Sequence, residues 1–172
     1  MFEDEGRFGR ISDRRSCWAP LPMRPDVGHQ VIREYVYAYG AVSPSDGGNA
    51  SLVLPWSDTQ TMSIFLKHTA EIFSSDYCIM FMDGAGWHRA GHLKVPENMH
   101  RAYLPPYSPE LNPVEHIGDY VRENYFGNEV FSSLKKVVDR LSLGLKNLHN
   151  QPEIIKSMTS FNWINTLCLT SN

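Results

Sequence analysis

The segment YCIMFMD, residues 77–83, constrains the fold of this 172-residue chain more than any other segment. It is a continuous apolar run that follows a helical pattern, which is typical of a strand buried on both faces of a sheet. It ends in Asp83, and a buried strand seldom ends in a carboxylate without purpose, because an unpaired buried charge is costly. Ligands of α/β proteins gather at the carboxyl ends of strands. The run therefore predicts a central strand whose end carries chemistry.

The surrounding pattern predicts an α/β domain with a mixed sheet covered by helices. Residues 33–42 and 49–56 have the aromatic and β-branched content of strands and flank the turn sequence PSDGG, so we expect a hairpin. Residues 57–73 show helical spacing, with Ser57 or Asp58 as the N-cap. The remaining predicted elements are a strand-like segment at 14–20, a short strand at 101–107, and helices from Pro113 to about Phe126 and from Ser133 to about Leu148.

Both ends of the chain carry a specific expectation. Met1 lies almost on top of the acidic run at residues 3–5, so the first strand is predicted to begin nearly at its end. Such a shortened strand suggests a chain that starts in the middle of a larger architecture. Residues 1–172 are interpreted as one domain, with 164–172 as a loose tail.

Three acidic residues are hypothesised to act together. Asp4 lies in the first strand, Asp83 ends the buried strand, and Glu115 lies in the first turn of a helix. Carboxylates from two strand ends and a helix would form a hard oxygen cage suited to Mg²⁺ or Mn²⁺. Two such ions, roughly 3.5–4 Å apart, support phosphodiester cleavage in known enzymes.

Each acid also has an ordinary structural explanation. Asp4 stands between Glu3 and Glu5, and a run of charges is usually a solvated face. Asp83 precedes a glycine, and Asp-Gly is common turn chemistry. Glu115 is the third residue after Asn112, which together would make a capping box. The residues alone leave both explanations open.

Charge and hydropathy limit the environment of the chain. No apolar run approaches the roughly 18 residues that a membrane span needs, and the first ten residues have no secretory pattern, so we expect a soluble, cytoplasmic chain without membrane partners. The net charge is −3, whereas proteins that hold DNA unaided usually carry a basic excess. Any DNA binding must therefore come from local patches or a partner domain.

A set of ordered motifs resembles one known family. The strings FEDEGRFGR (2–10), YVYAYGAV (35–42), DGAGWH (83–88) and LPPYSPELNPVEH (104–116) follow the pattern of the DDE superfamily endonuclease domain. The likeness is to insertion-sequence transposases related to the mariner group, and it extends from residue 2 to about 163. The proline-punctuated string at 104–116 is its most specific part.

This resemblance implies a ribonuclease-H-like fold with a mixed five-stranded sheet and flanking helices. It implies cleavage of DNA at transposon ends and joining of the 3′ ends to target DNA. The metal ligands would be Asp4, Asp83 and Glu115, holding two Mg²⁺ or Mn²⁺ ions. His88, Asn112 and Arg7 would support these ligands or contact DNA, although His88 is equally well explained as a structural histidine.

The resemblance also implies partners and has limits. The active complex would be a homodimer on bacterial DNA, associated with the nucleoid, and a separately encoded helix-turn-helix chain could read the terminal repeats. The family's helix-turn-helix region is not found in these residues, and Gly118 stands where the family commonly has an aromatic residue. Two alternatives therefore remain: an inactive transposase remnant that only folds or dimerises, and another ribonuclease-H-like nuclease.

Overall fold

The computed structural model describes residues 1–169, which are built around a five-stranded sheet in the order β3-β2-β1-β4-β5. The strand β1 (Phe2–Ile11) pairs antiparallel with β2 (Val31–Val42), which pairs antiparallel with β3 (Asn49–Leu54). On its other side β1 is parallel to β4 (Cys78–Met82), and β4 is parallel to β5 (Met99–Tyr103). The predicted mixed sheet is therefore confirmed.

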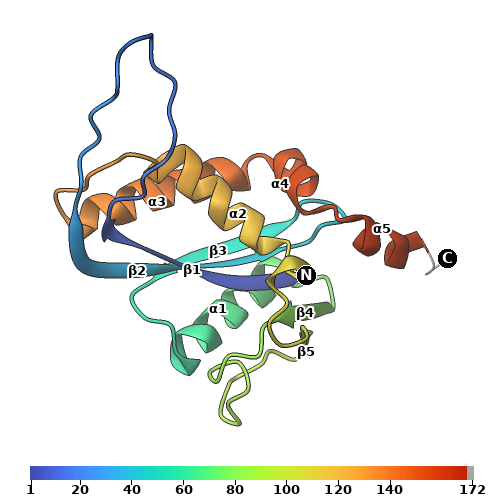
Figure 1. Cartoon of the computed structure of the whole chain (residues 1–172). Coiled ribbons are helices and arrows are strands. Elements are labelled where there is room, and N and C mark those ends of the chain that lie inside the picture. Colours follow the sequence, from blue (N-terminus) through green and yellow to red (C-terminus); the bar gives the residue numbers. More distant parts are fainter. Residues whose placement is uncertain (170–172) are drawn as a thin grey trace.

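Helices cover both faces of this sheet (Figure 1). The helix α1 (Thr59–Ile72) packs on one face, whereas α2 (Val114–Val121), α3 (Leu134–His149) and α4 (Pro152–Thr159) lie on the other. Each face has its own apolar core, because side chains alternate between the two sides of a strand. Within residues 1–169, no helix has both the length and the apolar character needed to cross a membrane.

The strand β4 lies inside the sheet as predicted, but only one of its faces is fully buried. Met80 and Met82 are inaccessible in the core beneath α1, whereas Ile79 on the other face is 49% exposed. The apolar run hides this difference, because a half-exposed isoleucine and a buried one look alike in sequence.

The first strand is long, which corrects the prediction that it begins nearly at its end. β1 has ten residues, and its pairing with β2 runs from Phe2 opposite Val42 to Ile11 opposite Val31. It continues beyond the acidic run because Phe8 is buried in the core beneath α2 and α3. Asp4 consequently lies near the start of the strand.

The segment 14–20 is not a strand, which corrects a second prediction. Residues 12–30 connect β1 to β2 as a long excursion away from the sheet (Figure 1). No neighbouring strand is available there, and Trp18 is fully exposed. The strand-like composition of residues 14–20 is therefore not enough to form a strand, because β-propensity reflects packing on a sheet and this segment has no sheet to pack on.

The helix starts follow their capping residues. α1 begins after Asp58, whose side chain accepts a hydrogen bond from the Thr61 N–H, so Asp58 and not Ser57 is the cap. α3 begins after Ser133, as predicted, and Ser133 accepts from the Lys136 N–H. The predicted helix from Pro113 is shorter: α2 ends at Val121 and continues as one π-helical turn to Phe126.

The last described helix occupies most of the segment expected to be loose. Where the sequence predicts a tail over 164–172, α5 spans Asn162–Leu169 and Ile164 is buried in the core beneath α2 and α3. Residues 170–172 lie outside the described residues.

Replacement of Gly118 by alanine is expected to stabilise the protein. Gly118 lies within α2, and a Cβ built there meets nothing within 4 Å. Alanine should raise the free energy of unfolding by about 0.5–1 kcal/mol because it restricts the unfolded backbone and favours the helix. Urea denaturation measures this change.

Gly144 in α3 provides the matched control. A Cβ at this position would lie 3.1 Å from the Tyr125 ring, so Gly144→Ala should gain less or lose stability. Equal stabilisation by both substitutions would contradict the open space assigned to Gly118.

Candidate active site

The three predicted acids line one cleft. Asp4, Asp83 and Glu115 all border it, together with Arg89 and residues 104–109. The parallel pairing of β1 and β4 explains why two of them meet. Phe2 is opposite Phe81, so the parallel register brings Asp4 and Asp83, each two residues further on, to the same cleft.

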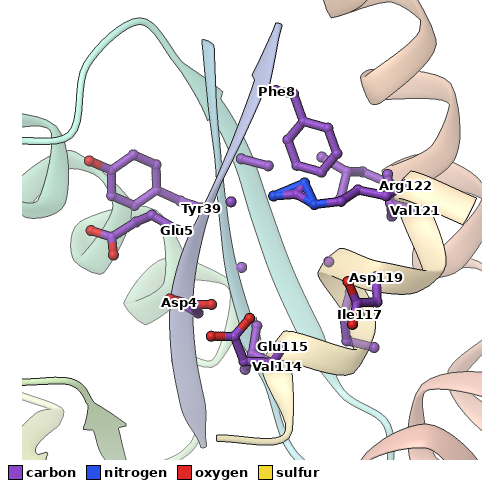
Figure 2. A pocket seen from close by; sticks show the side chains of 15 residues that line it. Asp4, Glu5, Phe8, Tyr39, Val114, Glu115, Ile117, Asp119, Val121 and Arg122 are labelled. Atoms are coloured by element: carbon purple, nitrogen blue, oxygen red, sulfur yellow. The ribbon is translucent and has the colours of Figure 1, made fainter. Parts of the chain in front are cut away.

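Glu115 approaches Asp4 from α2. Figure 2 shows the carboxylates of Asp4 and Glu115 pointing toward one another, with Glu5 on the opposite side of β1. Burial raises the pKa of Asp4 to about 7, and the negative charge of Glu115 adds to this shift. The cleft therefore brings acidic side chains together, with Arg89 as a cationic neighbour.

Asp83 is held in place although its side chain is 61% exposed. Its Oδ1 accepts a hydrogen bond from the Ala85 N–H at 2.9 Å and lies 2.7 Å from His88 Nδ1. The turn chemistry expected of an Asp-Gly pair is thus present, and it coexists with a position at the cleft. The same contacts fix the direction of the carboxylate.

Glu115 is not engaged in the predicted capping box. α2 begins at Val114 with Pro113 as its cap residue, and no side chain makes a capping-box pair there. Instead, Asn112 Oδ1 accepts from the Val114 N–H at 3.2 Å, and Asn112 Nδ2 donates to the backbone oxygen of Glu3 at 2.9 Å. Asn112 is therefore a buried tie between α2 and β1, and Glu115 is exposed to the cleft.

His88 and Arg7 occupy very different places. His88 is 1% exposed, and its Nε2 lies 3.0 Å from Glu5 Oε1. Burial lowers the pKa of His88, but the neighbouring carboxylates of Glu5 and Asp83 outweigh burial and the net shift is upward. Arg7 is exposed, and its guanidinium stacks on the Tyr35 ring 4.7 Å from the centroid. Of these two residues, only Arg7 has a side chain that a DNA phosphate could reach.

Sequence reasoning missed a second acidic cluster. Glu3 and Glu5 face away from Asp4, toward His88, and Glu3 is completely buried. Burial raises the pKa of Glu3 well above its ordinary value, and Glu5, Asp4 and Asp83 reinforce the shift. Side-chain alternation along a strand puts these glutamates on the face opposite Asp4, but which face is buried depends on the packing of residues 83–98.

Comparison with known proteins identifies the family. The family model described as DDE superfamily endonuclease matches residues 1–138. A protein of Sinorhizobium fredii (strain NBRC 101917 / NGR234), described as "Uncharacterized protein y4pE/y4sA", is 38% identical over 133 residues, which cover 75% of this chain and 96% of that protein. The residues matched by the family model include Asp4, Asp83 and Glu115.

Solved structures share the fold at low sequence identity. The structure titled "Mos1 transposase paired-end complex with left transposon end" superposes with a TM-score of 0.56 at 14% identity. The "Mos1 mariner paired end complex with Mn" gives a TM-score of 0.57, also at 14% identity. Each match covers 93% of this chain and 55% of the Mos1 chain, so this chain spans about half of its structural relatives. The likeness confirms the predicted ribonuclease-H-like fold, and the family match shows that the chain belongs to the DDE superfamily endonuclease family.

Proposed function

We propose that this chain is the catalytic part of a transposase that cleaves DNA at transposon ends and joins the ends to target DNA. The observation that carries the proposal is that Asp4 in β1, Asp83 directly after β4 and Glu115 in α2 line the same cleft. A DDE endonuclease family and a structural likeness to Mos1 transposase support the same class of reaction.

The cleft suits divalent metal ions. Its acidic groups offer only oxygen ligands, which Mg²⁺ and Mn²⁺ prefer. Burial raises the pKa of Asp4 to about 7, with a further contribution from the neighbouring carboxylates, and a bound cation would favour the charged form of Asp4. We assign Asp4, Asp83 and Glu115 as ligands of two such ions; a structure of Mos1 with Mn is consistent with the choice of metal. When bound, the ions would activate the attacking hydroxyl and stabilise the leaving oxygen.

The protein's own contribution is to hold these ligands before DNA binds. The Ala85 N–H and the His88 ring orient the Asp83 carboxylate, and Asn112 fixes the start of α2 relative to β1. Fixed ligands reduce the reorganisation required during reaction. No serine or tyrosine is needed as a nucleophile in this scheme, since water and a freed 3′-hydroxyl perform the two attacks.

DNA would be held by a few positively charged side chains near the cleft or on the surface. Arg89 borders the cleft and stacks on Tyr103, Arg7 is exposed, and Lys94 lies on the surface near α1. Arg101 is less suited, because its guanidinium already donates to the backbone oxygen of His88 at 2.7 Å. With a net charge of −3, these contacts give weak binding.

Assembly is the remaining part of the proposal. The paired-end description of the Mos1 complexes supports an active complex that holds two transposon ends, and we propose a homodimer on nucleoid DNA. Terminal repeats would be recognised by a helix-turn-helix segment supplied in the same or a separate chain. The alternatives of an inactive remnant or a different nuclease gain no support from the cleft, where all three acids are present.

The substitution Asp83→Asn tests the catalytic assignment. It should reduce Mn²⁺-dependent cleavage of transposon-end DNA by at least roughly a hundredfold, the scale on which single charge-stabilising groups contribute to catalysis. Asparagine keeps an oxygen for the Ala85 N–H, so the fold should persist. Cleavage is measured on labelled duplexes in gels.

Asp139→Asn is the control for this experiment. Asp139 pairs with Lys135 on the exposed side of α3, away from the cleft, so its loss should leave cleavage unchanged. Full activity of Asp83→Asn in a correctly folded sample would refute the mechanism.

Stability without divalent metal should fall as pH rises. The folded pKa of Asp4 is about 7, above its ordinary value of 3.8, so the folded protein retains a proton that the unfolded chain has released. The free energy of unfolding in EDTA should therefore decrease from about pH 4 to pH 7, and Asp4→Asn should weaken this dependence. Added Mn²⁺ should restore stability at pH 8.

Urea titrations at pH 5 and 8, with EDTA or Mn²⁺, measure this effect. Glu3 contributes in the same direction, so some pH dependence should persist in Asp4→Asn. A metal-free protein that becomes more stable over this range would show that the acids are not in the environment described.

DNA binding by these 172 residues should be weak and without preference for terminal repeats. Few phosphate contacts imply a shallow decrease of affinity with salt. Supplying the helix-turn-helix segment should restore preference, because contacts with base edges specify sequence. A salt titration against repeat and scrambled duplexes, with and without that segment, measures both properties. Tight, repeat-specific binding by the chain alone would mean that its DNA-reading element lies within these residues.

A further inference from the structure

A buried polar cluster lies on the face of β1 opposite the cleft. It consists of Glu3, Glu5 and His88, whose side chains are 0%, 5% and 1% exposed. Both carboxylate oxygens of Glu3 lack a hydrogen-bond partner among the residues that the structure describes. Buried polar groups are almost always paired, and an unpaired buried carboxylate is especially costly. Glu3 therefore requires a partner that the protein's own groups do not supply.

The geometry of the cluster matches the shell of a small metal ion. One ligand atom from each of the three residues lies within 4.8 Å of the other two. The Nε2 atom of His88 is 3.0 Å from Glu5 Oε1 and 3.7 Å from Glu3 Oε2. Metal bonds of about 2.0–2.2 Å in a tetrahedron place neighbouring ligands about 3.4 Å apart. The observed separations lie on either side of this value.

The histidine is already oriented as a ligand. Its Nδ1 lies 2.7 Å from Asp83 Oδ1, so a proton on Nδ1 leaves the lone pair of Nε2 directed at Glu3 and Glu5. Histidines that bind metals usually donate their other ring nitrogen to a carboxylate or carbonyl in this way. Trp87 also donates its indole N–H to Glu5 Oε1 at 2.8 Å, which fixes the second carboxylate.

We propose that Glu3, Glu5 and His88 bind one divalent transition-metal ion, of the Zn²⁺ class, in a buried site separate from the cleft. Two carboxylates and a neutral imidazole balance a charge of +2, and the ion supplies the missing partner of Glu3. An imidazole ligand favours Zn²⁺ and its neighbours over Ca²⁺ or Mg²⁺. Mg²⁺ in particular keeps several of its waters, which suits an open cleft better than an enclosed cluster.

A metal ion at this site would give a structural role to Glu3, Glu5 and His88, which do not line the cleft. Glu3 and Glu5 come from β1, whereas His88 comes from the segment between β4 and β5 that contains no strand or helix. An ion held by all three would fasten this segment to the central strand. Because His88 also contacts Asp83, the same ion would restrain one side of the catalytic cleft.

The test is Zn²⁺ binding to the full chain after removal of metal with EDTA, measured by calorimetry and by zinc content after dialysis. The double variant Asp4→Asn/Glu115→Gln removes two cleft ligands and should still bind one Zn²⁺. In that background, Glu3→Gln should lower the affinity at least tenfold, whereas Glu153→Gln, on the surface of α4, should leave it unchanged.

The outcomes separate this site from the proposed catalytic one. Absence of Zn²⁺ binding in the cleft double variant, or undiminished affinity in folded Glu3→Gln, would overturn the proposal and would assign the cluster to protons alone. If circular dichroism shows that Glu3→Gln does not fold, Glu5→Gln decides by the same criterion, since an amide oxygen can still accept from Trp87. The result does not depend on whether the chain cleaves DNA.

Discussion

The parallel pairing of β1 with β4 is the contact on which the rest of the site depends. It sets Phe2 opposite Phe81, 79 positions later in the chain, and so brings Asp4 and Asp83 to the same cleft. The N-terminal amine strengthens this junction by donating to the Ile79 oxygen at 2.7 Å. Without that register, α2 would still bring Glu115 to β1, but no second strand would add a carboxylate to the cleft.

The same strand presents acids to both faces of the sheet. Alternation places Asp4 with Glu115 on one face and Glu3 and Glu5 with His88 on the other. Burial raises the pKa values of both Asp4 and Glu3, and the neighbouring carboxylates add to each shift. Such a concentration of buried charge lowers stability unless cations or protons balance it, and this requirement connects the fold to the metal binding that we propose.

Much of this arrangement could be predicted from sequence, and the failures have physical causes. The hairpin, α1, α3 and the interior strand β4 follow from local periodicity and capping, and the convergence of Asp4, Asp83 and Glu115 followed from motifs that resemble a known family. The length of β1 could not be predicted, because it depends on pairing with β2 from Phe2 to Ile11, which local composition does not encode. Residues 14–20 have strand-like composition but no neighbouring strand, and only tertiary structure shows that.

The roles of the supporting residues also required three dimensions. A capping box of Asn112 and Glu115 was one of two explanations that the sequence left open. In the structure the Asn112 side chain donates to the Glu3 backbone oxygen and accepts from the Val114 N–H, so it links α2 to the strand that carries Asp4. No residue near His88 in the sequence indicates what its side chain contacts. In the structure its ring lies between Asp83 and Glu5 and thereby connects the two acidic clusters. Hydrogen bonds between residues 83 or 109 positions apart leave no local pattern. The chemistry of the cleft is therefore set by its acids, whereas its rigidity is set by the buried groups behind them.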